Sequence, residues 1–179
     1  MSTASRSSNG GRPRIAVGDT VVYAAHGVGR IVAREQTQVA GTERECVVVV
    51  LATGLRVTLP LAEAAERLRA VADDDELENV GRTLAADSGV RDGSWTKRIR
   101  ESKAKLAGGR PSELAEIVRD GGRFEQAGIG ARLTHAERNV YLQARQLLVM
   151  EICSARGVEQ GEAEAWIEAQ IVRHAGNGD

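Results

Sequence analysis

The sequence predicts an α+β protein in two parts, a small N-terminal β-barrel followed by a compact C-terminal bundle of about five helices. Residues 17–60 are rich in β-branched side chains and are interrupted by glycine, which is typical of short strands. After Pro60 the chain is rich in Ala, Leu, Glu and Arg, with apolar residues three and four positions apart, which is typical of amphipathic helices. A chain of 179 residues, 42% of them hydrophobic, is long enough for one or two domains with real cores.

Four stretches of the first part predict strands. They are residues 20–23, 28–39, 45–51 and 55–59. Turn residues separate these stretches: Gly18-Asp19, His26-Gly27, Ala40-Gly41 and Thr53-Gly54. Because the predicted strands are short and closely spaced, they indicate a small barrel.

Helices are expected in the second part. They lie near residues 73–86, 95–107, 112–120, 135–156 and 160–173. Thr134 and Glu137 form a T-x-x-E capping box before the fourth of these helices. Pro111 suits the first turn of a helix, and Gly108-Gly109 suits the end of the helix before it. Gly121-Gly122 is expected to end the short third helix.

The near-neutral charge, 24 Lys plus Arg against 25 Asp plus Glu, conceals a strong segregation along the chain. Residues 1–14 carry three Arg and no acid, a composition typical of a disordered arm. Residues 71–90 are strongly acidic, whereas residues 91–110 are strongly basic. We therefore divide the chain into an arm (1–14), a barrel (15–70) and a helical domain (71–175).

The residue inventory argues against several classes of protein. No apolar run approaches the ~20 residues that a membrane span needs, and the N-terminal stretch lacks the apolar region of a secretory signal, so a cytoplasmic protein is expected. Cys46 and Cys153 are far apart and are expected to be buried free thiols. The three His residues are scattered and no nucleophile, phosphate-binding or dinucleotide motif is present, so we expect no enzyme, cofactor or metal. The acidic run 73–75 is expected to cap a helix.

Trp95 is one of only two tryptophans and opens the basic helix, directly after the expected N-cap Ser94. It shares a helical face with Ile99 and Leu106, so it could belong to the core. As a first-turn residue it could instead project beyond the helix end, where an apolar wedge ringed by cations suits a base step opened at the minor groove. The sequence alone leaves both interpretations open. The second tryptophan, Trp166, is expected in the core.

Five segments, in order along the chain, carry a resemblance to a known family. They are 17–31 (VGDTVVYAAHGVGRI), 58–64 (TLPLAEA), 94–98 (SWTKR), 114–120 (LAEIVRD) and 133–155, which contains ER at 137–138 and ARQLL at 144–148. Together they resemble the CarD/CdnL family of bacterial RNA-polymerase-binding transcription regulators over about residues 15–172.

The resemblance implies a Tudor-like barrel, shared with transcription-repair coupling factor, that binds the β subunit of RNA polymerase. It implies a monomeric factor that is recruited through polymerase, not through a DNA sequence, and that stabilises promoter open complexes. Trp95 would then be a wedge at the upstream edge of the bubble, and Arg100 and Arg138 would contact the DNA backbone. The neighbouring cations Lys97 and Arg98 are expected to join this DNA-binding surface.

The barrel departs from the family at two basic positions that some relatives use against polymerase, which align with Thr37 and Thr58. Arg34 and Arg56 lie nearby, and side chains two apart along a strand share a face, so both are expected to substitute. The alternative function is a Tudor- or KOW-like protein-interaction adaptor without DNA contact, which predicts that Trp95 is buried in the bundle.

Overall fold

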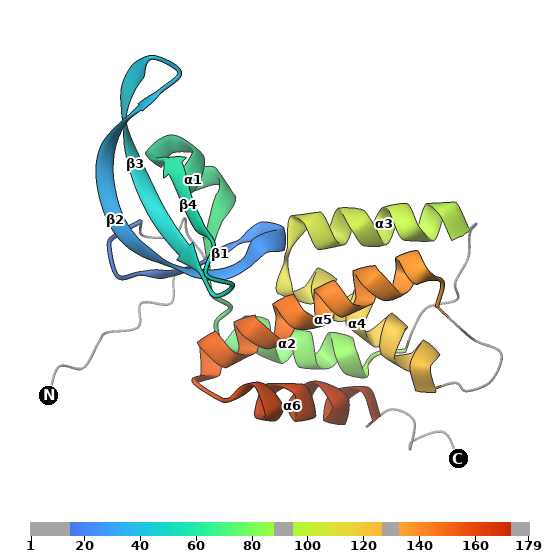
Figure 1. Cartoon of the computed structure of the whole chain (residues 1–179). Helices are drawn as coiled ribbons and strands as arrows, with labels where there is room; N and C mark the ends of the chain where they lie inside the picture. Colours follow the sequence, from blue (N-terminus) through green and yellow to red (C-terminus); the bar gives the residue numbers. More distant parts are fainter. Residues whose placement is uncertain (1–14, 88–94, 127–132, 173–179) are drawn as a thin grey trace, which may run out of the picture.

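The computed structural model describes residues 15–87, 95–126 and 133–172 (Figure 1). An antiparallel sheet is followed by a helical bundle, which confirms the predicted fold class. The sheet has the order β4-β3-β2-β1-β5. Its strands are β1 (Thr20–Tyr23), β2 (Gly27–Val39), β3 (Thr42–Leu51), β4 (Arg56–Pro60) and β5 (Leu68–Ala70). The arm 1–14 and the expected N-cap Ser94 lie outside the described residues.

The hairpin of β2 and β3 projects beyond the rest of the sheet (Figure 1). Its two-residue turn is Ala40-Gly41, with φ angles of 50° and 80°. Two positive φ angles match a type I′ turn, whose twist suits a tight hairpin. A bulge between Ile31 and Ala33 leaves Val32 without a direct partner in β3 and bends the strand.

One face of the sheet forms the core of the first part. Alternate residues of β3 point into it, because successive side chains of a strand lie on opposite faces. This core consists of Val21, Ile31, Val47, Val49, Leu51, Leu59, Ala64 and Leu68. The short helix α1 (Leu61–Arg67) covers it through Ala64, and the chain then returns to the sheet as β5.

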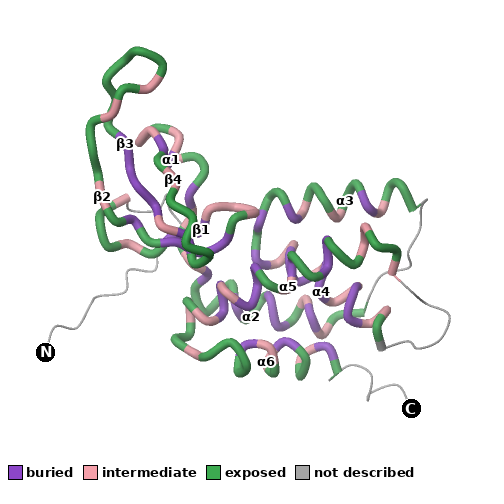
Figure 2. Tube along the Cα trace, viewed as in Figure 1, coloured by how far each residue is buried: buried purple, intermediate pink, exposed green. Residues whose placement is uncertain are grey.

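Five helices form the second part of the described chain. They are α2 (Asp74–Ala85), α3 (Trp95–Gly108), α4 (Pro111–Gln126), α5 (His135–Arg156) and α6 (Gln160–Val172). α5 is the longest and contributes the largest share of the buried residues of their common core (Figure 2). Helix α4 packs against both α2 and α5, and α3 and α6 lie on opposite sides of the bundle (Figure 1).

The helix boundaries follow the sequence signals in most places. Thr134 and Glu137 form the expected capping box, and the acidic run caps α2 through a second box between Asp73 and Glu76. α4 begins at Pro111 as expected. The turn before it contains Gly109, whose φ of 63° is in the left-handed region.

The expectation that Gly121-Gly122 ends a helix is wrong, because α4 continues to Gln126. A Cβ atom on Gly121 would lie 2.3 Å from Cδ2 of Tyr141, on α5. Glycine therefore permits α4 to approach the Tyr141 ring closely, and it serves helix packing here and not helix termination.

Two further expectations are confirmed only in part. Cys46 is fully buried, but Cys153 is half-buried. Burial and the nearby Glu159 carboxylate raise the pKa of the Cys153 thiol. Trp166 packs against the edge of the core while remaining partly exposed, with the Arg156 guanidinium 4.3 Å from its ring centroid.

The sheet and the bundle are joined by close contacts. A Cβ on Gly27, at the start of β2, would lie 2.8 Å from Cε of Met150 on α5. A Cβ on Gly109 would lie 2.8 Å from the backbone of Ala24. These close approaches, together with an ion pair between β5 and α5, position the bundle against the strands.

Candidate nucleic-acid interface and sheet face

Trp95 is the first residue of α3 and is 45% exposed. Ile99 and Leu106, which share its helical face, are both buried against the bundle. The apolar stripe of α3 therefore enters the core only after the first turn. Of the two interpretations left open by the sequence, burial of Trp95 in the core is wrong.

A hydrogen bond joins the exposed indole to the start of α5. Nε1 of Trp95 donates to Oγ1 of Thr134 over 3.2 Å. Thr134 is the N-cap of α5, so the N-termini of α3 and α5 lie side by side. Each helix N-terminus carries a partial positive charge that favours an anion, and at α5 the Glu137 carboxylate of the capping box already lies against it.

The predicted DNA-binding cations fall into two groups. Lys97 and Arg100 are exposed on α3, and Arg138 is exposed on the first turn of α5 with its guanidinium 3.8 Å from Glu125. Arg98 is half-buried, and its guanidinium lies 3.9 Å from Glu137. Arg98 therefore faces α5, whereas the other three remain accessible.

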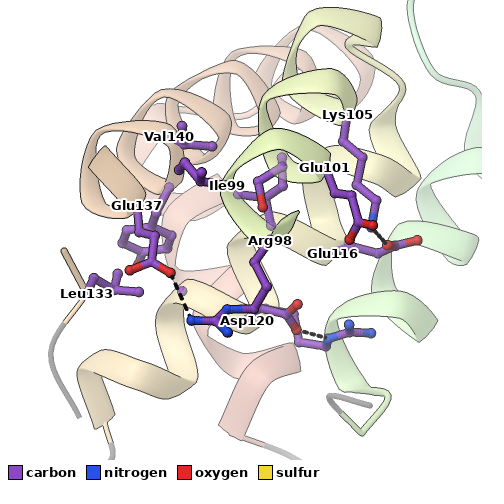
Figure 3. A pocket seen from close by; sticks show the side chains of 14 residues that line it. Arg98, Ile99, Glu101, Lys105, Glu116, Asp120, Leu133, Glu137 and Val140 are labelled. Atoms are coloured by element: carbon purple, nitrogen blue, oxygen red, sulfur yellow. Dashed lines mark hydrogen bonds and ion pairs between the residues drawn. The ribbon is translucent and has the colours of Figure 1, made fainter. Parts of the chain in front are cut away.

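A groove of about 260 Å³ lies between α3, α4 and α5 (Figure 3). Ion pairs line it, joining Arg98 to Glu137, Lys105 to Glu116 and Arg119 to Asp120. The first two connect α3 to α5 and to α4. These ion pairs thus help to hold α3 against α4 and α5.

Tyr141 forms part of the same groove. Burial raises the pKa of its phenol, and the Glu125 carboxylate acts in the same direction.

The described residues contain no group of three or more His, Cys, Asp or Glu side chains placed to hold a metal ion. In the described part of the chain, no helix is long and apolar enough to cross a membrane.

The strand register determines which sheet residues share a face. Thr58 pairs with Val48 and Arg56 with Val50, so both lie on the face opposite the core residues Val47 and Val49. Thr37 pairs with Arg44, which is an even number of positions from Val48 and hence on the same outer face. The outer face of the sheet therefore carries Thr37, Arg56 and Thr58.

Arg34 lies on the other face. It pairs with the core residue Val47 and forms an ion pair of 2.6 Å with Glu45 on the same face. Arg34 and Thr37 are three positions apart in a regular ladder, and an odd separation puts side chains on opposite faces. The expectation that Arg34 substitutes on the face of Thr37 is therefore wrong.

Fold and site together define a two-part protein, in which a small sheet presents one surface and a helical bundle presents another through its basic helix α3. The profile of the CarD-like/TRCF RID domain, a Tudor-like fold, matches residues 15–72. The profile of the CarD C-terminal domain matches residues 79–168. The chain therefore belongs to the CarD family, whose members are transcription regulators that interact with RNA polymerase.

A curated relative agrees with this assignment. The chain is 23% identical over 152 residues to YdeB of Bacillus subtilis (strain 168), which is named as a candidate transcription factor. The match covers 84% of this chain and 97% of YdeB. The two parts of the chain therefore occur in the same order in that relative.

Sequence reasoning missed two long-range contacts around the site. One joins Trp95 to Thr134, 39 positions apart, and the other joins Arg69 to Glu151, 82 positions apart. The capping motif at Thr134 was visible in the sequence, but no local pattern indicates which indole its hydroxyl meets. Arg69 and Glu151 have no sequence signature, because their pairing depends on the docking of the sheet on the bundle.

Proposed function

We propose that this protein stabilises promoter open complexes while tethered to RNA polymerase, with Trp95 as a wedge at the upstream edge of the bubble. One observation carries the proposal. A large apolar side chain, 45% exposed, begins a basic helix beside the N-terminus of a second helix. An exposed indole among cations and helix N-termini suits a DNA edge, where phosphates surround a base step that has begun to unstack.

In this proposal residues 15–70 bind the β subunit of polymerase through the outer face of the sheet, and residues 71–175 contact DNA. Arg56, Thr58 and Thr37 form the polymerase-binding face. Lys97, Arg100 and Arg138 contact DNA phosphates, while Arg98 supports them through its contact with Glu137. Phosphate contacts carry no sequence information, so promoter choice rests with polymerase. The protein acts as a cytoplasmic monomer.

Tethering explains why neither contact needs to be strong alone. Once the sheet is bound to polymerase, DNA contact becomes intramolecular and occurs at a high effective concentration. The factor stabilises the open complex only by its difference in affinity for the open and closed states. A wedge that fits an unstacked edge supplies such a difference, because unstacking an intact step opposes its entry.

The test is the lifetime of competitor-resistant open complexes formed by cognate holoenzyme on an unstable promoter. We expect wild type to lengthen this lifetime and Trp95→Ala to lose the effect while still binding polymerase. Leu142→Ala is the matched control, because Leu142 is a similarly exposed apolar residue, at 47%, on α5. An equal effect of wild type and Trp95→Ala contradicts the wedge. Polymerase binding without any effect on lifetime favours the adaptor without DNA contact.

A further inference from the structure

The hydroxyl group of Thr134 uses all of its hydrogen-bonding capacity. It donates its proton to Oε2 of Glu137 over 2.8 Å. It accepts one hydrogen bond from the backbone N–H of Glu137 over 3.3 Å and another from Nε1 of Trp95 over 3.2 Å. A hydroxyl has one proton and two lone pairs, so these three bonds leave it a single orientation.

Glu137 determines how the hydroxyl is oriented. Its Oε2 atom also accepts from the backbone N–H of Thr134 over 3.0 Å, which completes the capping box. Because the carboxylate takes the hydroxyl proton, a lone pair of Thr134 points toward the indole. The Oε1 atom of Glu137 lies 3.9 Å from the Arg98 guanidinium, on the turn of α3 that follows Trp95.

We propose that Thr134, oriented by Glu137, is a positioning residue that holds the Trp95 indole ready for insertion. This inference rests on the proposed function and adds a role for the capping box of α5. Trp95 is 45% exposed, so packing restrains only part of its ring, and the hydrogen bond to Thr134 supplies a further restraint. Fixing one such side chain before binding is worth about two- to tenfold in affinity, because its rotamer entropy has already been lost.

The first experiment measures the free protein. Trp166→Phe leaves Trp95 as the single tryptophan, so its fluorescence reports on one ring. In this background we expect Thr134→Val to increase acrylamide quenching and to lower the steady-state anisotropy of Trp95. Thr134→Ser retains the hydroxyl and is expected to restore both values. Unchanged quenching and anisotropy in Thr134→Val would overturn the inference directly, without polymerase or DNA.

Thr134→Val also removes a helix cap, so a capping control is needed. Asp73→Ala removes the equivalent cap of α2, which has no contact with Trp95 in the described structure. We expect Asp73→Ala to lower stability by a similar amount and to leave Trp95 fluorescence unchanged. If Asp73→Ala changes Trp95 fluorescence as much as Thr134→Val does, loss of helix stability explains the effect and the inference fails.

The second experiment measures open-complex lifetime at saturating factor. We expect open complexes formed with Thr134→Val to have a lifetime about two- to tenfold shorter than those formed with wild type. Thr134→Ser should give a lifetime close to that of wild type. In a Trp95→Phe background, which has an aromatic ring without an N–H, Thr134→Val should have no additional effect. An equal effect in both backgrounds would overturn the inference.

The two proposals fail in different ways. If Trp95→Ala does not shorten the lifetime, the wedge function fails, and with it the functional part of this inference. If Trp95→Ala shortens the lifetime but Thr134→Val does not, only the positioning role of Thr134 is wrong.

Discussion

Arg69 of β5 and Glu151 of α5 form a two-point ion pair between the sheet and the helical bundle. Nη2 of Arg69 donates to Oε2 of Glu151 over 2.7 Å, and Nη1 donates to Oε1 over 2.5 Å. Glu151 is 1% exposed and also accepts from the backbone N–H of Ala72. Nη2 of Arg69 further donates to the carbonyl of Gly109, between α3 and α4, over 2.6 Å. One guanidinium thus joins the sheet edge to α5 and to the turn between α3 and α4.

This ion pair predicts a large loss of stability when one partner is removed. Glu151→Ala leaves the Arg69 guanidinium without its counter-charge and should lower the free energy of unfolding by about 3 kcal/mol. The measurement is urea denaturation followed by circular dichroism. Glu63→Ala is the control, because the exposed pair of Glu63 and Arg67 should contribute no more than about 0.5 kcal/mol. Equal losses in both variants would contradict a structural role for the buried pair.

The contact between Gly121 and Tyr141 predicts opposite outcomes for two glycine substitutions. Gly121→Ala puts a methyl group against the Tyr141 ring and should destabilise the protein by about 1–3 kcal/mol. Gly161→Ala, on α6, meets no atom within 4 Å and should leave stability unchanged or raise it by up to about 1 kcal/mol. Thermal unfolding of both variants distinguishes packing at residue 121 from general helix propensity. A stabilised Gly121→Ala would show that the helices separate readily at this point.

Most of the fold was predictable, because local patterns determine most of its elements. Strand alternation and the capping box at Thr134 marked β2, β3 and the start of α5 within a few residues. Strand β5 was not predicted, since its three residues continue the helical composition of α1 and become a strand only by pairing with β1. Gly121 was misread for the same reason. Its role depends on Tyr141 in another helix, and sequence spacing carries no information about that approach.

The site shows the same division between local and tertiary information. The basic helix and its tryptophan were visible in the sequence, but the exposure of Trp95 depends on how α3 packs beside α5. In the sheet, the register shows that Arg56 lies on the face of Thr58, two positions away. Arg34 lies on the face opposite Thr37, because the two are three positions apart. Successive side chains of a strand alternate between its two faces, so the face of a residue follows from its position once the strand pairing and the bulges are known.

The separation of Arg56 from Arg34 predicts unequal effects on polymerase binding. Arg56→Glu reverses a charge on the proposed polymerase-binding face and should weaken binding to the β subunit at least about tenfold at low salt. Arg34→Glu, on the opposite face, should have little effect beyond losing its pair with Glu45. The measurement is titration of each variant against labelled holoenzyme. Weaker binding for Arg34→Glu than for Arg56→Glu would place the interface on the core side of the hairpin.

The accessible cations of α3 predict a change in salt dependence. Arg100 is exposed and pairs with no carboxylate in the described part of the chain, so it is available for a phosphate. Each phosphate contact releases counterions and adds about one to the slope of log affinity against log salt. We therefore expect Arg100→Ala to reduce the factor-dependent salt slope of open-complex lifetime by about one.

Lys105 is the matched control for Arg100, since it lies on the same helix and is paired with Glu116 of α4 at 2.5 Å. Lys105→Ala removes the same charge but no available phosphate contact, so the salt slope should be unchanged. The comparison separates a specific contact from a general loss of positive charge. If both variants reduce the slope equally, DNA responds to the net charge of α3. A reduction confined to Arg100→Ala means that the exposed side of α3 faces the DNA backbone, as the wedge orientation requires.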